Sequence, residues 1–138
     1  MEKKIDIYKA AGILIKDRKF LGTRSKGKKF FISPGGKIQL NESIQDALKR
    51  ELYEELKIDV DASDLQNFGT FFAVAKGEED KYLQMDVLIV SKWKGHIIPS
   101  NEIEETMWID SKLSSDIELG SIFKNDVLPK LKSLNLIN

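Results

Sequence analysis

Three glutamates in the middle of the chain have a spacing that would gather their carboxylates on one side of a helix. Glu51, Glu54 and Glu55 are three and four residues apart, which is about one helical turn. Like charges at this spacing repel, and each pair weakens a helix by a few tenths of a kcal/mol. The same arrangement offers hard oxygen ligands to Mg²⁺, with Mn²⁺ as an alternative ion. From the spacing alone, a metal site and a solvated acidic helix face are equally compatible with the sequence.

A glycine turn and a further glutamate precede these carboxylates at fixed distances. Glu42 follows Gly36 by six residues, and Arg50 begins the run Arg-Glu-Leu-Tyr-Glu-Glu-Leu-Lys-Ile. Residues 36–58 thereby resemble the Nudix box: Gly, five residues, Glu, seven residues, Arg-Glu-aliphatic-x-Glu-Glu-x-Gly-aliphatic. The chain departs from the box at its last glycine, which is Lys57 here, at a helix-ending position where left-handed backbone is favoured. Because no expected ligand is lost, catalysis is expected to survive this change.

The resemblance implies the Nudix fold, an α/β/α sandwich with a central mixed β-sheet, and a role for each residue of the box. Arg50 would orient the Glu51 carboxylate through a charge-assisted hydrogen bond and so support catalysis. Glu42 would tie the preceding loop to the helix. The implied metal ligands are the carbonyl of Gly36 and the carboxylates of Glu51, Glu54 and Glu55.

Family chemistry is attack of water on a nucleoside diphosphate linked to another group. Metal ions neutralise the phosphates and activate the water, and a carboxylate that often lies outside the box takes the proton. Glu102 lies six residues before Trp108, and in the MutT-type branch a loop glutamate at about that distance from a comparable tryptophan has this role. Glu105 is the second candidate and Glu51 the third. The alternative is that residues 101–105 form a solvated acidic turn.

Further residues resemble the MutT-type branch, which cleaves nucleoside triphosphates to monophosphate and pyrophosphate. Arg24 and Lys37 flank the Pro-Gly-Gly turn and would bind phosphates, the first with a planar fork and the second with a mobile ammonium; a plain basic surface is the alternative. Asn125 would contact a purine edge or cap a helix. Phe72 would stack on a base or pack in a core. Ser33 stands where the branch has phenylalanine.

The elements that must position these residues follow from the hydrophobic pattern. Apolar residues recur at three and four between 43 and 56, which predicts a helix with one buried stripe. A second helical segment is predicted over 121–134, where Pro129 should kink or restart it. Residues 33–36 are predicted to interrupt regular secondary structure. Residues 76–80 are predicted to form the hairpin loop that joins two strands of a β-meander. Strands are predicted over 8–15, 20–23, 30–32, 68–75, 82–93 and 106–109. This order of elements predicts an α/β (α+β) fold, a mixed sheet with helices packed on it.

Composition narrows the class of protein. The 138 residues, 41% apolar, suit one domain over 1–138. Since 22 basic residues balance 22 acidic ones, no extended nucleic-acid binding is expected. The absence of cysteine excludes disulfides and thiol chemistry and fits a reducing compartment. The longest N-terminal apolar run is six residues, so neither a membrane span nor an export signal is expected. The protein is expected to be cytoplasmic, as a monomer or homodimer.

These features predict a Mg²⁺-dependent nucleotide pyrophosphohydrolase, with a nucleoside triphosphate, an oxidised purine one included, as the first substrate class. Nucleotide sugars, dinucleoside polyphosphates and RNA 5′ ends are alternative substrates. A non-catalytic Nudix-fold sensor that binds a nucleotide is the alternative function. Intact Glu51, Glu54 and Glu55 favour the enzyme, because a sensor need not keep three mutually repelling carboxylates.

Overall fold

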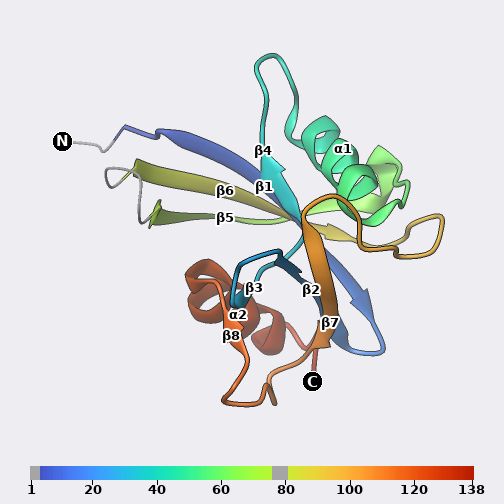
Figure 1. Ribbon diagram of the computed structural model, residues 1–138, viewed down its shortest axis with the longest axis vertical. Coiled ribbons are helices and arrows are strands. Elements are labelled where there is room, and N and C mark those ends of the chain that lie inside the picture. The colour runs from blue at the N-terminus through green and yellow to red at the C-terminus, as the bar shows by residue number, and fades with distance from the viewer. Residues whose placement is uncertain (1–3, 76–80) are drawn as a thin grey trace.

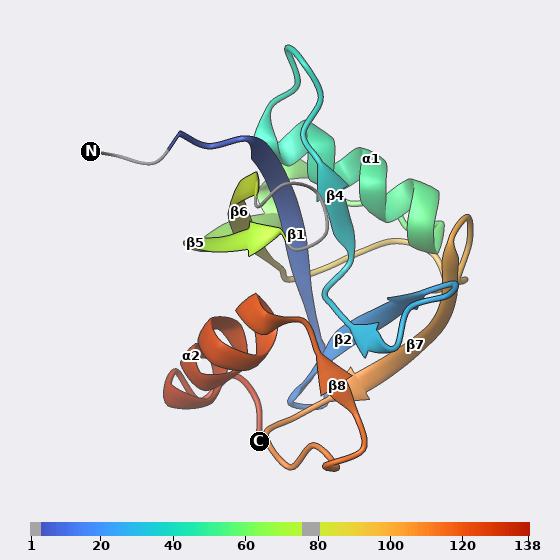
Figure 2. The same cartoon turned by 60° about the vertical axis from the view of Figure 1, so that its left-hand side comes forward.

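The fold is a mixed sheet with a helix on each face (Figures 1 and 2), as the sequence predicts. The structure is a computed structural model that describes residues 4–75 and 81–138, so the predicted turn at 76–80 lies outside the described residues. The strands are β1 (Ile7–Lys16), β2 (Lys19–Ser25), β3 (Phe30–Phe31), β4 (Gly35–Lys37), β5 (Leu65–Ala75), β6 (Lys81–Val90), β7 (Ile103–Ile109) and β8 (Glu118–Leu119). The helical segments are α1 (Ile44–Leu56), a 3₁₀ turn η1 (Ala62–Asp64), a π-helical turn η2 (Phe123–Val127) and α2 (Leu128–Ser133).

Strand β1 organises the sheet because it has neighbours along both edges. The strand order is β5-β6-β1-β2-β7, and β4 pairs with β1 beside this path. On one edge β1 runs parallel to β6, and on the other it pairs antiparallel with β4 through Lys9 and with β2 through Ile15. The first half of β1 therefore carries β4, and its second half carries β2. Strands β3 and β8 form a separate parallel pair.

One prediction about strands is wrong, one is confirmed, and two strand boundaries differ. Gly35 and Gly36 do not end regular structure but form β4, because their backbone lies so close to β1 that a side chain at Gly35 would collide with the Ala10 carbonyl. The predicted pairing of strands 68–75 and 82–93 is confirmed, since β5 runs antiparallel to β6, although β6 ends at Val90 rather than at residue 93. Strand β7 also begins at Ile103, three residues before the predicted start at 106.

Helix α1 is confirmed, with clear reasons for both of its ends. The Ser43 hydroxyl accepts a hydrogen bond from the Asp46 amide at 3.0 Å and caps the first turn. At the other end Lys57 has left-handed backbone, with φ 59°, and its amide donates to the Tyr53 carbonyl at 3.0 Å. The buried stripe consists of Ala47, Leu48, Leu52 and Leu56.

Two apolar clusters lie on the two faces of the sheet, and β1 serves both. Leu14 packs with the α1 stripe, whereas its neighbour Ile13 packs with Phe123 and Leu131 on the α2 face, as expected for alternating side chains in a strand. The predicted helical segment is confirmed over 121–133, but it neither stops nor restarts: the π-helical turn leads directly into α2, and Pro129 stands in the first turn of α2. Within the described ranges, no helix is long and apolar enough to cross a membrane.

Candidate active site

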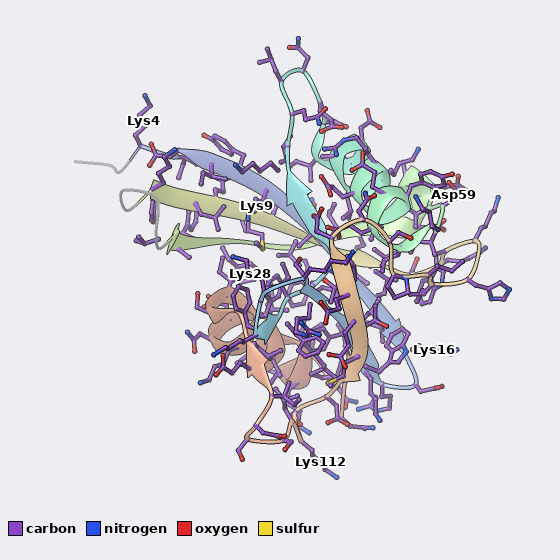
Figure 3. All side chains as sticks on the ribbon, viewed as in Figure 1. Lys4, Lys9, Lys16, Lys28, Asp59 and Lys112 are labelled. Atoms are coloured by element: carbon purple, nitrogen blue, oxygen red, sulfur yellow. The ribbon has the colours of Figure 1, made fainter. Side chains whose placement is uncertain are left out.

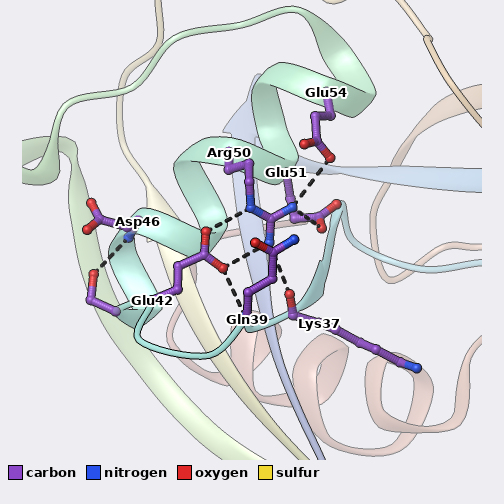
Figure 4. A network of polar contacts seen from close by, with 8 residues as sticks. Lys37, Gln39, Glu42, Asp46, Arg50, Glu51 and Glu54 are labelled. Carbon is purple, nitrogen blue, oxygen red and sulfur yellow. Dashed lines mark hydrogen bonds and ion pairs between the residues drawn. The ribbon is translucent and has the colours of Figure 1, made fainter.

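Arg50 is the centre of a polar network between α1 and the loop that precedes it (Figure 4). Its guanidinium binds Glu42 twice, from Nε at 2.7 Å and from Nη2 at 2.9 Å. Nη1 donates to Glu51 at 2.8 Å and, more weakly, to Glu54 at 3.4 Å. Nη2 also donates to the Lys37 carbonyl at 3.1 Å. The planar fork of arginine thus connects the end of β4 to two of the three clustered carboxylates.

Glu42 ties the loop to the helix, as the resemblance implies. One of its oxygens accepts the Gln39 amide at 3.0 Å, and its own amide donates to the Gln39 carbonyl at 3.1 Å. Hydrogen bonds from the Arg50 side chain and from the Gln39 amide lower the pKa of Glu42 to about 2. The carboxylate is therefore ionised at neutral pH and holds Arg50 in place.

The carboxyl group of Glu55 is buried inside the protein. Its residue is 5% exposed, and one oxygen accepts the Gly35 amide at 3.0 Å. Burial, with a smaller contribution from the negative charges of Glu51 and Glu102, raises its pKa to about 8. Burial likewise raises the pKa of Glu51, against the opposing effect of Arg50. Two poorly solvated carboxyl groups therefore lie close together, which is a site that a cation would stabilise.

Gly36 provides the space in which the Glu51 carboxyl group lies. A β-carbon at Gly36 would be 2.6 Å from the Glu51 carboxyl carbon, which is closer than real contacts. The resemblance to the Nudix box implies a metal-binding carbonyl at Gly36, but it implies neither this packing role nor the Gly35 amide that donates to Glu55. The glycine pair was the signal for a close backbone approach.

The donor set fits a hard divalent ion. Such ions prefer carboxylate oxygens and usually keep several waters. In the part of the chain that the structure describes, no group of three or more acidic or histidine side chains is already arranged around one point. Glu54, whose side chain is 44% exposed, is the member that remains free to turn towards an ion. Gly36, Glu51, Glu54 and Glu55 therefore remain the predicted ligands.

The structure brings Glu102 to this cluster and keeps Glu105 apart from it. The Ser100 amide donates to the Glu55 carbonyl at 2.8 Å, which fixes the chain just before Glu102 against α1. The charge of Glu102 contributes to the raised pKa of both Glu51 and Glu55. Glu105 instead pairs with an arginine of β2. Of the two candidates in this loop, Glu102 is the one whose charge acts on the cluster, and its role as general base remains a prediction.

The predicted substrate residues are more dispersed. The Lys37 side chain extends away from the Arg50 network (Figure 4). Phe72 is half exposed and stacks on Tyr82, with ring centroids 5.9 Å apart. Asn125 is exposed within the π-helical turn rather than at a helix start, so the capping alternative is wrong. Contacts of Arg24, Lys37, Phe72 and Asn125 with a substrate remain predictions.

A cavity of 490 Å³ opens on the α2 face of the sheet. Its walls are mainly apolar and come from β3, β5, β6, β8 and the chain that leads into η2. Lys9 and Lys28, both labelled in Figure 3, line it as well. Lys9 pairs with Lys37 in the β1–β4 ladder, one residue from the pair formed by Ala10 and Gly36. Strand β1 therefore connects the cavity, which Lys9 lines, with Gly36, the glycine against which the Glu51 carboxyl group lies. No local sequence pattern predicts this cavity, since its walls come from distant segments.

Comparison with known proteins agrees with this geometry. The family model of the NUDIX domain matches residues 7–130. The chain belongs to the Nudix hydrolase family. Within that family, the chain is 30% identical over 128 residues to an 8-oxo-dGTP diphosphatase of Buchnera aphidicola from Acyrthosiphon pisum, covering 86% of this chain and 98% of that protein. This relative identifies the chain as a Nudix protein of the MutT type.

Two further proteins support the assignment. An 8-oxo-dGTP diphosphatase of Buchnera aphidicola from Schizaphis graminum is 33% identical over 90 residues, covering 62% of this chain, which spans 64% of that relative's length. The crystal structure of a MutT NUDIX hydrolase from Burkholderia pseudomallei superimposes with a TM-score of 0.74 at 17% identity, over 86% of this chain and 92% of that one. At this identity the second likeness concerns the Nudix fold alone.

Proposed function

We propose that this Nudix protein hydrolyses a nucleoside triphosphate to the monophosphate and pyrophosphate, with an oxidised purine nucleotide as the first candidate substrate and Mg²⁺ as the metal. The observation that carries the proposal is the pair of poorly solvated carboxyl groups, Glu51 and Glu55, held against the two glycines of β4. The names of the 8-oxo-dGTP diphosphatase relatives support the choice of substrate class.

Each residue of the cluster has a separate task in this proposal. A divalent ion bound there would neutralise charge on the phosphates and lower the pKa of a water molecule. Arg50 holds Glu51 in one orientation at 2.8 Å, and the Gly35 amide holds Glu55 at 3.0 Å. Glu102 accepts the proton of the attacking water, because its charge acts on the cluster and its carboxylate accepts no hydrogen bond from the described residues.

The nucleoside is proposed to occupy the cavity on the α2 face. Its 490 Å³ falls within the size range of small-molecule pockets. Apolar side chains such as Leu83 and Met85 suit the faces of a base, and the ammonium groups of Lys9 and Lys28 suit its polar edge or the phosphates. Lys37 is the predicted phosphate contact at the end of β4, beside the carboxylate cluster.

The test is product analysis with purified protein and Mg²⁺. The substrates are normal and oxidised nucleoside triphosphates, nucleotide sugars, dinucleoside polyphosphates, and capped or triphosphorylated RNA. Glu54→Gln is the matched variant, because the Glu54 side chain is half-exposed and makes one long contact, 3.4 Å, with Arg50. We expect monophosphate and pyrophosphate from the wild type, and loss of turnover with an unchanged melting temperature in the variant.

Other outcomes separate the alternatives. If a different compound of the panel is hydrolysed, the proposed hydrolase activity stands and the proposed substrate class is wrong. A nucleotide that raises the melting temperature without being hydrolysed would instead support the sensor. Near wild-type turnover by Glu54→Gln would remove Glu54 from the metal site.

A further inference from the structure

Arg24 on β2 binds two consecutive glutamates of the neighbouring strand β7. Its Nη2 lies 3.0 Å from a Glu104 oxygen and its Nε 3.1 Å from a Glu105 oxygen. Nη1 donates to the Lys28 carbonyl at 3.0 Å. All three guanidinium nitrogens thus have acceptors within the protein, and the side chain is 20% exposed. A phosphate would have to compete with these contacts.

Two consecutive residues reach one guanidinium because β7 is irregular at this point. Arg24 is opposite Glu105, but the next residue of β2, Ser25, is opposite Ile103, so Glu104 is an extra residue in the ladder. In a regular strand, neighbouring side chains point to opposite faces. This bulge puts both carboxylates within reach of Arg24 and leaves Ile103 buried in the core.

The bulge also sets the position of Glu102. The Glu102 carbonyl accepts the Lys26 amide at 2.8 Å, and the Ser100 amide donates to the Glu55 carbonyl at 2.8 Å. The chain that enters β7 passes beside α1 (Figure 1) and is attached there at one end and at the bulge at the other. Glu102 lies between these two attachments.

We infer that Arg24 is a positioning residue, which keeps Glu102 beside the α1 carboxylates by neutralising Glu104 and Glu105 at the bulge. The inference rests on the proposed function, in which Glu102 accepts the proton. Without the guanidinium, the adjacent negative charges of Glu104 and Glu105 repel each other. Glu104, the extra residue of the bulge, also loses its ion pair with β2. A displaced general base lowers kcat, whereas loss of a phosphate ligand mainly weakens substrate binding.

Two variants distinguish positioning from phosphate binding. Arg24→Met removes the guanidinium, and the double variant Glu104→Gln/Glu105→Gln keeps it but removes its charged partners. For positioning, both variants lower kcat by roughly 10-fold to 100-fold with little change in KM. For phosphate binding, Arg24→Met raises KM, and the double variant leaves kcat intact because it frees the guanidinium. Arg24→Lys should recover part of the kcat, since one ammonium replaces the fork incompletely.

A double-mutant cycle tests whether Arg24 acts through Glu102. We expect Glu102→Gln to lower kcat by roughly 10²-fold to 10⁴-fold. Adding Arg24→Met to this variant should then change kcat by less than about twofold, because the group being positioned is already lost. Independent, multiplicative effects overturn the inference, and so does wild-type kcat for Glu102→Gln. Arg18→Met is the control, since Arg18 binds Asn135 and Asn138 near the C-terminus, away from the cluster.

Amide hydrogen exchange tests the contacts of Arg24 with Glu104 and Glu105 independently of enzyme activity. The Lys26 amide should lose protection in Arg24→Met and in Glu104→Gln/Glu105→Gln, while the Gly12 amide, which donates to Pro34, stays protected. Unchanged protection at Lys26 in both variants overturns the inference. A wild type that hydrolyses nothing is instead a failure of the proposed function. An active wild type whose kcat is unaffected by Arg24→Met is a failure of this inference alone.

Discussion

Arg50 and Glu42 form a side-by-side ion pair with two hydrogen bonds, 2.7 and 2.9 Å long, across eight residues of chain. Glu42 lies in the loop before α1, and Arg50 lies in the middle of the helix. The pair fixes the loop against the helix and leaves Nη1 of the guanidinium directed at Glu51. Arg50 therefore connects the loop before α1 with Glu51, a predicted metal ligand.

Acid should weaken this ion pair in a defined range of pH. The pKa of Glu42 is lowered to about 2 from an ordinary value of 4.5. The stabilisation is therefore complete above pH 4.5 and is lost as the pH falls towards 2. Glu42→Gln should lower the melting temperature at pH 7 and flatten its decline between pH 4.5 and 2. Asp46→Asn, on the same helix, is the control, and a Glu42→Gln profile parallel to the wild type contradicts the prediction.

Gly36→Ala should displace the Glu51 carboxyl group. The new methyl would be 2.6 Å from the carboxyl carbon, but that carboxyl is the end of a flexible side chain and can move. We therefore expect a small loss of stability with a large loss of turnover and of stabilisation by Mg²⁺. Glu51→Ala removes the carboxyl group with which the new methyl collides, so Gly36→Ala should cost less stability in that background. Equal costs in both backgrounds, measured by denaturant unfolding, would falsify the steric explanation.

Without metal, Glu55 should make the protein less stable as the pH rises. Burial raises its pKa to about 8 from an ordinary value of 4.5, so the folded state holds a proton that the unfolded chain releases. The free energy of unfolding then decreases between pH 4.5 and 8. Unfolding in a chelator should show this slope for the wild type and a weaker one for Glu55→Gln.

A divalent ion should reverse this effect. Binding needs the ionised carboxylate, so Mg²⁺ should raise the melting temperature more at pH 8 than at pH 6. Glu55→Gln should lose most of this response, because the amide cannot balance the charge of the ion. An equal response to Mg²⁺ in wild type and Glu55→Gln would exclude Glu55 as a ligand.

Lys57→Gly should stabilise the protein. Lys57 ends α1 with φ 59°, a conformation that costs a residue with a side chain about 1 kcal/mol relative to glycine. We expect the melting temperature to rise by roughly 2–5 °C, even though the Lys57 ammonium lies 5.1 Å from the centroid of the Tyr53 ring and that contact is lost. Lys57→Ala loses the same contact and keeps the strained backbone, so it should not stabilise. A lower melting temperature for Lys57→Gly would show that the contact of the Lys57 ammonium with the Tyr53 ring contributes more stability than the left-handed backbone costs.

Elements that depend on local sequence information are predictable without the structure. Helix α1 follows from an apolar period of three and four, a serine cap and a run of strong helix formers, all within a few turns. The same spacing puts Glu51, Glu54 and Glu55 on one side of that helix whatever surrounds it. The contacts of Arg50 with Glu42 and Glu51 were also implied, because all three residues belong to one short motif.

Features that depend on pairing between distant segments follow only from the folded chain. The sequence does not state that β1 has neighbours on both edges, so it gave no sign that Gly35 and Gly36 form a strand or that β7 joins β2. The bulge that joins Arg24 to Glu104 and Glu105 needs two strands in a particular register. Strand pairing and burial are properties of the whole sheet, and so the electrostatics of Glu55 and the cavity on the α2 face exist only in the folded chain.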